Sequence, residues 1–249
     1  MNAKLEQAKR YISQTSTSTQ SIGTKQEKTL HQTIKYYLTT DESLHEIKLE
    51  NKIVDIYKDG EIFEIQTQGF DKMRDKLSTL LPKYNLTIVF PIAHVKTIHS
   101  VNNLGVVEQT RKSPKKQSPF EIFKELYKIK QYLNDYNLHF KIIMFLSEEL
   151  RDIVPKKHVR SKGYVRSDQI VNDIIKEYNI YRKEDFNILL DEINLPLEFT
   201  TADIKKLTKV SVKTSSLVLN ILLYLGLVEK IGSKNRYILY KRKNQNAEA

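Results

Sequence analysis

The sequence predicts an α/β protein in which a mixed β-sheet is flanked by helices and followed by a smaller C-terminal domain. The first observation is the order of elements over residues 27–93: a helix, three short strands, a second helix and a continuous apolar strand. A meander makes neighbouring strands antiparallel, whereas a crossover helix makes them parallel, so this order builds a mixed sheet. The second observation is a helix, a turn, another helix and two strands over residues 199–240.

The composition indicates a folded protein that binds a polyanion. Hydrophobic residues make up 40% of the 249 residues and charged residues 29%, which excludes a disordered chain. The sequence has no cysteine, which excludes disulfides and thiolate metal sites. It shows no secretion signal and no run of roughly 18 apolar residues, so we expect a soluble, cytoplasmic protein. The net charge of +11 favours nucleic acid as the partner first and an anionic membrane surface second.

The N-terminal half carries most of the predicted sheet. A short helix over residues 3–12 precedes a Ser/Thr/Gln-rich linker over 13–24. Apolar residues at helical spacing then predict a helix over 27–38. The elements predicted next are strands over 45–50, 53–57 and 62–67, a helix over 70–82, and strands over 85–93 and 95–102.

Two basic stretches without a single acid separate the later elements. The elements predicted there are a basic loop over 109–118, a helix over 119–134, a strand over 139–146, a second basic stretch over 155–166 and a helix over 167–178. The predicted divisions of the chain are an N-terminal helix and linker (1–26), the α/β domain (27–150), a basic loop and helical connector (151–198), the C-terminal domain (199–243) and a tail (244–249).

The hairpin over residues 53–67 poses an electrostatic problem. A two-residue turn at Asp59-Gly60 places Asp55 directly opposite Glu64, and like charges in that position destabilise a sheet. Three interpretations remain open. Both carboxylates stay hydrated on an exposed sheet edge, nearby lysines neutralise them, or a divalent cation such as Mg²⁺ bridges them, since hard oxygen ligands suit that ion.

With these residues in place, the segment over about 27–100 resembles the core of the PD-(D/E)XK nuclease superfamily, which includes restriction endonucleases and Holliday-junction resolvases. The matching residues are Asp55 and then Glu64-Ile65-Gln66, with Glu27 at the acid that resolvase-like members carry. The resemblance implies that Glu27, Asp55 and Glu64 hold Mg²⁺ or Mn²⁺. It also implies catalytic roles for Asp55, Glu64 and Gln66.

The sequence departs from the motif at Gln66, which stands where the family has a lysine. Glutamine can position a water or a phosphate oxygen but cannot supply positive charge. Lys72 or Lys76 on the following helix either reaches in to replace that lysine or lies on the surface. His31, one helical turn after Glu27, either contacts phosphate and holds the glutamate or serves in packing.

Positive charge outside this core predicts contacts to the DNA backbone, which basic clusters bind without reading sequence. The predicted DNA-binding residues are His31, Arg111, Lys112, Lys115, Lys116, Arg160, Lys162, Arg166, Lys213, Lys234 and Arg236. The segment from Thr200 to Lys243 carries ten basic residues and two acids, and so eight of the eleven net positive charges.

The C-terminal segment has the winged-helix pattern, in which the second helix reads the major groove and the hairpin touches phosphates. That second helix, predicted from about Lys213 to Leu225, carries Leu219 and Leu223 on a side where a DNA-reading helix is normally polar. We therefore expect the rest of the protein, or a second subunit or protein partner, to cover Leu219 and Leu223.

Together these patterns predict a DNA-binding protein with a metal-dependent endonuclease activity. The alternative is a regulatory DNA-binding protein that keeps the nuclease fold without catalysis, and an RNA-binding adaptor is a third possibility. Similarity of fold alone does not decide between them, because one fold hosts many functions.

Overall fold

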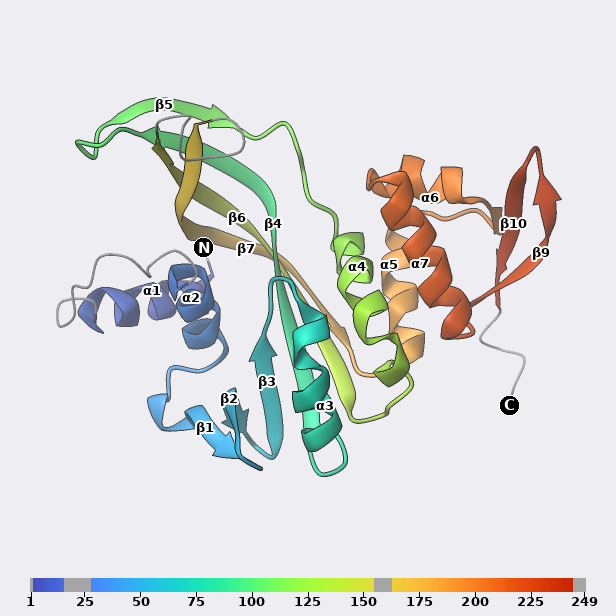
Figure 1. The fold of residues 1–249 in the computed structure, drawn as a ribbon, viewed down its shortest axis with the longest axis horizontal. Helices are drawn as coiled ribbons and strands as arrows, with labels where there is room; N and C mark the ends of the chain where they lie inside the picture. Colours follow the sequence, from blue (N-terminus) through green and yellow to red (C-terminus); the bar gives the residue numbers. More distant parts are fainter. Residues whose placement is uncertain (1, 16–27, 155–162, 244–249) are drawn as a thin grey trace.

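The structure, a computed structural model, describes residues 2–15, 28–154 and 163–243, and it confirms an α/β fold with a large mixed sheet flanked by helices (Figure 1). The strands of the seven-stranded sheet are β1 (His45–Leu49), β2 (Lys52–Lys58), β3 (Glu61–Ile65), β4 (Asn85–Val101), β5 (Val107–Lys112), β6 (Leu138–Ile153) and β7 (Tyr164–Ile180). Their order is β1-β2-β3-β4-β6-β7, and β5 pairs with β4. None of the helices in these ranges combines the length and apolar character needed to cross a bilayer.

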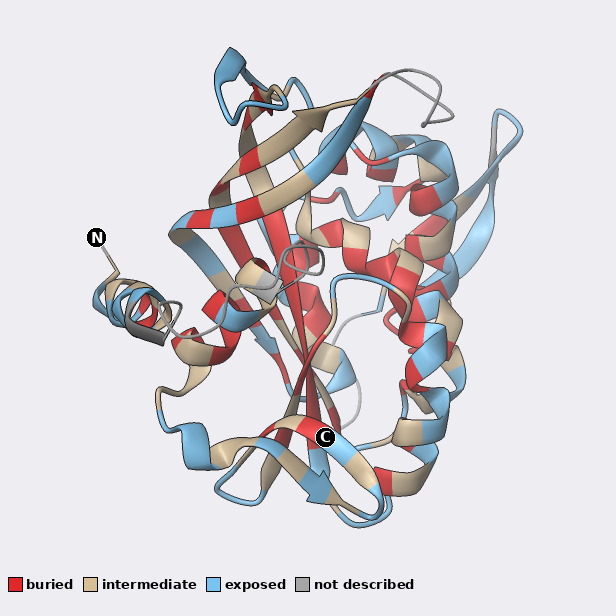
Figure 2. Ribbon diagram, turned by 60° about the vertical axis from the view of Figure 1, so that its left-hand side comes forward, coloured by how far each residue is buried: buried red, intermediate tan, exposed pale blue. Residues whose placement is uncertain are grey.

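The sheet is mixed in the way the order of elements predicts. β1, β2 and β3 form an antiparallel meander, whereas β4 runs parallel to both β3 and β6. The crossover between β3 and β4 consists of the short 3-10 helix η2 (Phe70–Met73) and helix α3 (Arg74–Leu80). The central strand β4 is continuously buried over its first half, as an apolar strand covered on both faces should be (Figure 2).

Helices cover both faces of the sheet. Helices α1 (Ala3–Thr15) and α2 (Lys28–Leu38) pack on one face, where Ile34 joins a core cluster with Ile65 and Val89. On the other face, α3 shares the larger core cluster with the segment η3 (Pro119–Ile122), α4 (Phe123–Leu126) and η4 (Tyr127–Tyr132). A further short helical element, η1 (Glu42–Leu44), connects α2 to β1.

Several predicted elements differ from those found. The strands expected over 85–93 and 95–102 are one strand, β4, with an irregularity near Ala93, and the first half of the basic loop expected over 109–118 is strand β5. The expected strand over 139–146 extends to Ile153 as β6.

The helix expected over 167–178 is wrong, because these residues lie in strand β7. Its apolar residues Ile170, Val171, Ile174, Ile175 and Tyr178 recur at nearly helical spacing. β7 pairs with β6 along its whole length through three register shifts, which alter the simple alternation of a strand. The connector expected over 151–198 is therefore in large part a strand of the main sheet.

The C-terminal unit consists of two helices, a hairpin and a short third strand. Its elements, with the short helices that lead into them, are η6 (Lys183–Phe186), α5 (Asn187–Glu192), β8 (Glu198–Phe199), α6 (Thr201–Thr208), α7 (Val212–Tyr224), β9 (Val228–Lys234) and β10 (Tyr237–Arg242). Thr200 caps α6 with Asp203 in a reciprocal capping box. The three strands lie in the order β8-β10-β9.

Helix α7 packs against α4 of the same chain. Leu219 is only 2% exposed, and it belongs with Phe123 and Leu126 to the core cluster that also contains the α3 side of the sheet. Leu223 is partly buried against that cluster. The same chain, and not a second subunit, therefore buries Leu219, which is not available for contact with a partner. This is one of the two arrangements that the sequence leaves open for Leu219 and Leu223.

Candidate functional site

The β2–β3 hairpin forms with the predicted register, but its ladder ends one residue short of the predicted pair of Asp55 with Glu64. Lys58 pairs with Glu61, Tyr57 with Ile62, and Ile56 with Phe63 around the turn at Asp59-Gly60. Both turn residues have positive φ, at 52° and 82°, which is the conformation of a type I′ turn.

Beyond the Ile56–Phe63 pair, two carboxylates take over the hydrogen bonds of the ladder. The amide of Asp55 donates to Glu64 Oε1 at 3.3 Å, and the amide of Ile65 donates to Asp55 Oδ2 at 2.7 Å. Each acid therefore accepts a bond from the neighbouring strand. Hydrogen bonds to the charged form stabilise it, and these bonds offset part of the repulsion between the two acids.

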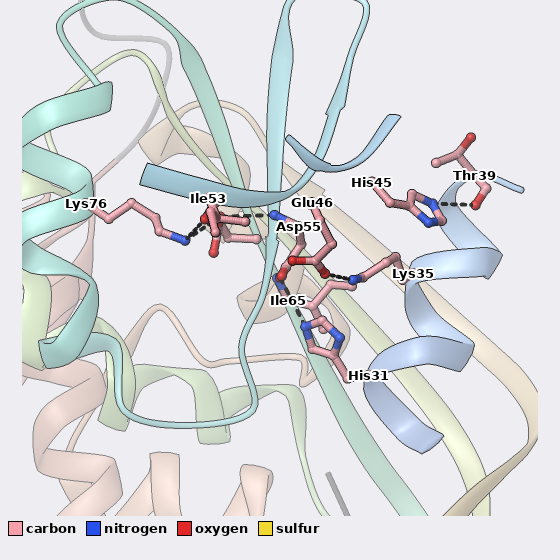
Figure 3. A network of polar contacts seen from close by, with 10 residues as sticks. His31, Lys35, Thr39, His45, Glu46, Ile53, Asp55, Ile65 and Lys76 are labelled. Atoms are coloured by element: carbon pink, nitrogen blue, oxygen red, sulfur yellow. Dashed lines mark hydrogen bonds and ion pairs between the residues drawn. The ribbon is translucent and has the colours of Figure 1, made fainter. Parts of the chain in front are cut away.

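Two basic side chains, His31 and Lys76, complete this arrangement from opposite sides (Figure 3). His31 of α2 lies with Nε2 3.1 Å from Asp55 Oδ2. Lys76 of α3 donates to Glu64 Oε1 at 2.8 Å and to the carbonyl oxygen of Ile53 at 2.7 Å. Of the two positions considered for Lys76, the structure shows the one in which its side chain reaches the acids of the hairpin.

The environment pushes the pKa values of the two acids apart. Burial and then the negative charge of Asp55 raise the pKa of Glu64 from its usual 4.5 to about 7, although Lys76 opposes this. Burial also acts to raise the pKa of Asp55, but the hydrogen bond and charge of His31 and the Ile65 amide outweigh it, so the pKa of Asp55 is lowered. Glu64 is 1% exposed, which excludes the hydrated sheet edge as an explanation for the pair.

The acids line a cleft of about 760 Å³. Among the residues predicted for the site, His31, Asp55, Glu64, Gln66 and Arg166 all line it. Other polar residues of the lining, which the sequence did not single out as site residues, include Lys35, Glu46, Lys96, Gln117, Glu121 and Gln169. The structure therefore brings the predicted acids and their neighbours into one concave site.

The remaining predicted residues lie elsewhere. Arg111 and Lys112 are exposed on β5, and Lys115 and Lys116 follow in the loop after it, where Lys115 lies 3.6 Å from Glu121 at the cleft. Lys213 begins α7 and Arg236 lies at the tip of the β9–β10 hairpin, and both are exposed. Glu27, Arg160, Lys162 and the side chain of Lys234 lie outside the described residues. Lys72 is exposed, in contrast to Lys76.

The oxygen donors of the cleft suit a hard divalent cation in part. Among the described residues no three His, Cys, Asp or Glu side chains gather closely enough to hold a metal ion. Asp55 and Glu64 use Oδ2 and Oε1 in their hydrogen bonds, and within the same residues Asp55 Oδ1 and Glu64 Oε2 have no partner. Two carboxylates, each with one oxygen to offer at a cleft, fit the coordination habits of Mg²⁺, which keeps several water ligands.

Glu149 of β6 is a further polar residue that the sequence does not single out, and two of the lining residues, Lys96 and Gln169, contact it or pair with it across strands. Lys96 and Gln169 lie in segments with strand-like and helix-like patterns, and these patterns do not mark them as residues of a cleft wall. The alternation of Ser147, Glu149 and Arg151 along β6 places them on one face of the sheet, and a polar face on a strand that begins as an apolar run was the available signal.

The fold and the cleft define an α/β protein with a mixed sheet and a charged cleft where β2 and β3 separate. The chain belongs to the family described as a domain of unknown function (DUF8091), which matches residues 28–181. All the cleft residues named above fall inside this range. The chain is similar to an uncharacterized protein of Treponema pallidum (strain Nichols), with 33% identity over 132 residues. The aligned region covers 53% of this chain and 53% of the relative, so the chain spans about half of that relative's length. No solved structure matches the chain significantly.

Proposed function

We propose that the protein is a metal-dependent DNA endonuclease of the PD-(D/E)XK type with a C-terminal winged helix. The observation that carries the proposal is the meeting of Asp55, Glu64, Gln66 and Lys76 at one cleft, with one unengaged oxygen on each acid within the described residues. The fold supports it. A helix, an antiparallel meander, a crossover helix and a strand parallel to the third strand are the elements of the nuclease core, in the same order.

Each side chain of the cleft has a role in phosphodiester hydrolysis under this proposal. Asp55 and Glu64 would hold the cation, and the resemblance adds Glu27 as a third ligand. A bound Mg²⁺ supplies positive charge at the scissile phosphate and lowers the pKa of a water. Gln66 orients the water or a phosphate oxygen, and Lys76 brings the positive charge that Gln66 lacks. His31 is a positioning residue, because its contact is with Asp55.

The C-terminal unit supports a second contact with DNA. α6 and α7 meet at a tight turn where Lys209 is left-handed, and the hairpin β9–β10 follows as a wing. Lys130 of η4 donates to Asn220 and lies 4.7 Å above the ring of Tyr224, so the C-terminal part of the exposed side of α7 is occupied. Lys213 at the start of α7 and Arg236 on the wing remain for phosphate contacts.

One observation favours the second candidate, a DNA-binding regulator without catalysis. Asp55 already has a hydrogen-bonding partner in His31 and Glu64 has an ion-pair partner in Lys76, so each acid is engaged without a metal ion. A site that evolved away from catalysis needs such internal neutralisation, because an unpaired buried charge is costly.

Cleavage assays separate the two candidates. Plasmid, branched and single-stranded DNA are incubated with Mg²⁺ or Mn²⁺ and the wild-type protein, Asp55→Asn, Glu64→Gln or the control Glu50→Gln, whose exposed side chain pairs with Lys83. The nuclease proposal requires cleavage by the wild type and Glu50→Gln and its loss in the other two variants. No cleavage of any substrate by the wild type, with DNA binding equal in wild type and Asp55→Asn, establishes the regulator.

A further inference from the structure

The sheet extends beyond the cleft as an arm of four strands, which we define as residues 95–101, 107–112, 147–153 and 164–171. In Figure 1 these parts of β4, β5, β6 and β7 project away from the helices. Residues directly paired across strands share a face of the sheet. One such row joins Arg111, Ile98, Glu149 and Gln169, so Arg111 lies on the face that includes Glu149 and Gln169.

The same face carries two more arginines. Arg151 lies two residues after Glu149 on β6, and its partner on β7 is Arg166. Arg166 and Gln169 line the cleft that holds Asp55 and Glu64, and so does Lys96 of β4. This face of the arm is therefore the continuation of the cleft, and we call Lys96, Arg111, Arg151 and Arg166 the arm cations.

A buried acid fixes two of the arm cations in place. Glu149 is 2% exposed, and it accepts a hydrogen bond from Lys96 Nζ at 2.7 Å and one from Arg151 Nε at 2.6 Å. Burial acts to raise the pKa of Glu149, but Lys96 and Arg151 outweigh it and lower that pKa. Glu149 is thus a carboxylate, and its single charge is shared between two cations.

The other two arm cations have no acidic partner within the described residues. Arg166 NH1 lies 3.4 Å from Oε1 of Gln169, which is 4% exposed and donates to Ser147 Oγ at 3.1 Å. This chain of hydrogen bonds orients the guanidinium of Arg166 without neutralising it. Arg111 is exposed on β5 and takes part in no ion pair there. Four cations and one acid leave the face strongly positive.

The pairing of Arg151 with Arg166 is unfavourable for the protein alone. Like charges directly opposite each other destabilise an antiparallel pair, and Glu149 relieves only the Arg151 side. An anion between the two guanidinium groups removes this repulsion. Guanidinium groups bind phosphate oxygens through paired N–H donors, so phosphate is the anion that these residues fit best.

We propose that the arm cations form a subsite for the backbone phosphates of the DNA strand that enters the cleft. The location of the cut at Asp55 and Glu64 rests on the proposed function, whereas binding of backbone phosphates by the arm does not. Glu64 lies level with Ile88 on the neighbouring strand β4, and Lys96 follows eight residues further along β4. At about 3.3 Å per residue the two sites are at most roughly 26 Å apart, which a B-form strand covers in about eight nucleotides.

The test is binding of a labelled 24-base-pair DNA duplex in EDTA, so that no cleavage contributes, at a series of salt concentrations. We expect Arg166→Gln and Arg111→Gln each to weaken binding about 3- to 10-fold at 0.1 M salt and to lower the slope of log K against log salt by roughly 0.9. The matched control is Lys48→Gln, an exposed lysine of β1 outside the cleft lining. Affinities and slopes of Arg166→Gln and Arg111→Gln equal to those of Lys48→Gln overturn the proposal.

Glu149→Gln gives a result of opposite sign. It keeps the shape of the side chain but releases Lys96 and Arg151 from its charge, so we expect binding about 3-fold tighter or more and a steeper salt slope. If Glu149 has only a structural role, Glu149→Gln should instead weaken binding. Circular dichroism shows whether the variant is folded. The double variant Glu149→Gln/Arg151→Gln should return to wild-type affinity if the effect is electrostatic. If the wild-type protein cleaves nothing but Arg166→Gln weakens binding, only the nuclease proposal is overturned. If the wild-type protein cleaves but Arg166→Gln, Arg111→Gln and Glu149→Gln bind like wild type, only the arm subsite is overturned.

Discussion

Lys76 donates a hydrogen bond to Glu64 across the gap between helix α3 and strand β3, with Nζ 2.8 Å from Oε1. The lysine side chain is partly exposed, whereas Glu64 is buried, so Lys76 carries its charge from the rim of the cleft to an acid that solvent barely reaches. The positive charge of Lys76 offsets the repulsion between Glu64 and Asp55, because Asp55 raises the pKa of Glu64 and Lys76 lowers it.

Removal of Lys76 should therefore destabilise the protein in a pH-dependent way. Lys76→Met keeps most of the aliphatic chain and leaves Glu64 buried without its cation. We expect a loss of about 2–4 kcal/mol at pH 8 and a smaller loss at pH 6, where a proton on Glu64 replaces the missing charge. Urea unfolding at both values measures this. Lys72→Met, an exposed lysine of η2, should change stability by less than about 0.5 kcal/mol. Equal effects of the two variants contradict the role of Lys76.

Glu64 should make the folded protein less stable as the pH rises from about 4.5 to 7. Its pKa is raised to about 7 in the folded state, so its stabilising contribution is complete below the ordinary value of 4.5 and lost as the pH rises through about 7. The pKa of Asp55 is lowered, so the contribution of Asp55 is complete above its ordinary value of 3.8 and is lost only at lower pH. The two windows do not overlap.

Glu64→Gln isolates that contribution. Since glutamine does not titrate, the difference in unfolding free energy between wild type and Glu64→Gln should change by an amount of order 2 kcal/mol between pH 5 and pH 7.5, in favour of the variant at high pH. A pH-independent difference contradicts the raised pKa of Glu64.

The large-scale order of the fold was predictable because it follows from local signals. The type I′ turn at Asp59-Gly60 fixes the register of β2 and β3, and the continuous apolar run beginning at Leu86 indicates a strand covered on both faces. The strand β7 was not predictable in the same way. Its apolar residues follow a helical period, and only the free edge of β6, a tertiary feature, decides that they form a strand.

The site was predictable at its centre and not at its edges. Asp55 and Glu64 stand in a short hairpin, where sequence spacing determines which residues are neighbours. The strands separate beyond the Ile56–Phe63 pair, on the side away from the turn, and this lets the carboxylates accept backbone hydrogen bonds. The sequence does not show this separation. The approach of Lys76 depends on the packing of α3, and the meeting of Lys96 with Glu149 depends on the parallel register of β4 and β6.

The burial of Leu219 predicts that the C-terminal unit unfolds together with the sheet. Leu219→Ala should cost about 2–4 kcal/mol, the usual range for a buried leucine, and the protein should still unfold in a single transition. Circular dichroism and tyrosine fluorescence measured along a urea series test this. Ser216→Ala, at an exposed position of the same helix, should be nearly neutral. Two transitions, of which the variant shifts only one, contradict a shared core.

The exposed cations of the C-terminal unit should contribute to DNA affinity separately from the cleft. We expect Lys213→Gln/Arg236→Gln to weaken binding of a duplex in EDTA about 10-fold at 0.1 M salt, since two phosphate contacts are removed. Lys183→Gln, an exposed lysine of η6 whose nearest acid is Glu184 at 3.9 Å, serves as the control. Binding by the double variant that equals the control contradicts contact between the C-terminal unit and DNA.

Divalent cations should stabilise the protein through Asp55 and Glu64, and the effect should depend on pH. A cation binds the carboxylates in their ionised form, so protons compete with it at Glu64, whose pKa is about 7. We expect 10 mM Mg²⁺ or Mn²⁺ to raise the melting temperature of the wild type at pH 8 and to have little effect at pH 5.5. Ligand linkage gives about 2.7 kcal/mol when the free ion is at 100 times its dissociation constant. Asp55→Asn and Glu64→Gln should abolish the shift, whereas Glu50→Gln, with its exposed acid, should retain it. A shift of equal size in all four proteins identifies general screening by salt, and no shift in any of them indicates that the contacts with His31 and Lys76 satisfy the acids without a metal ion.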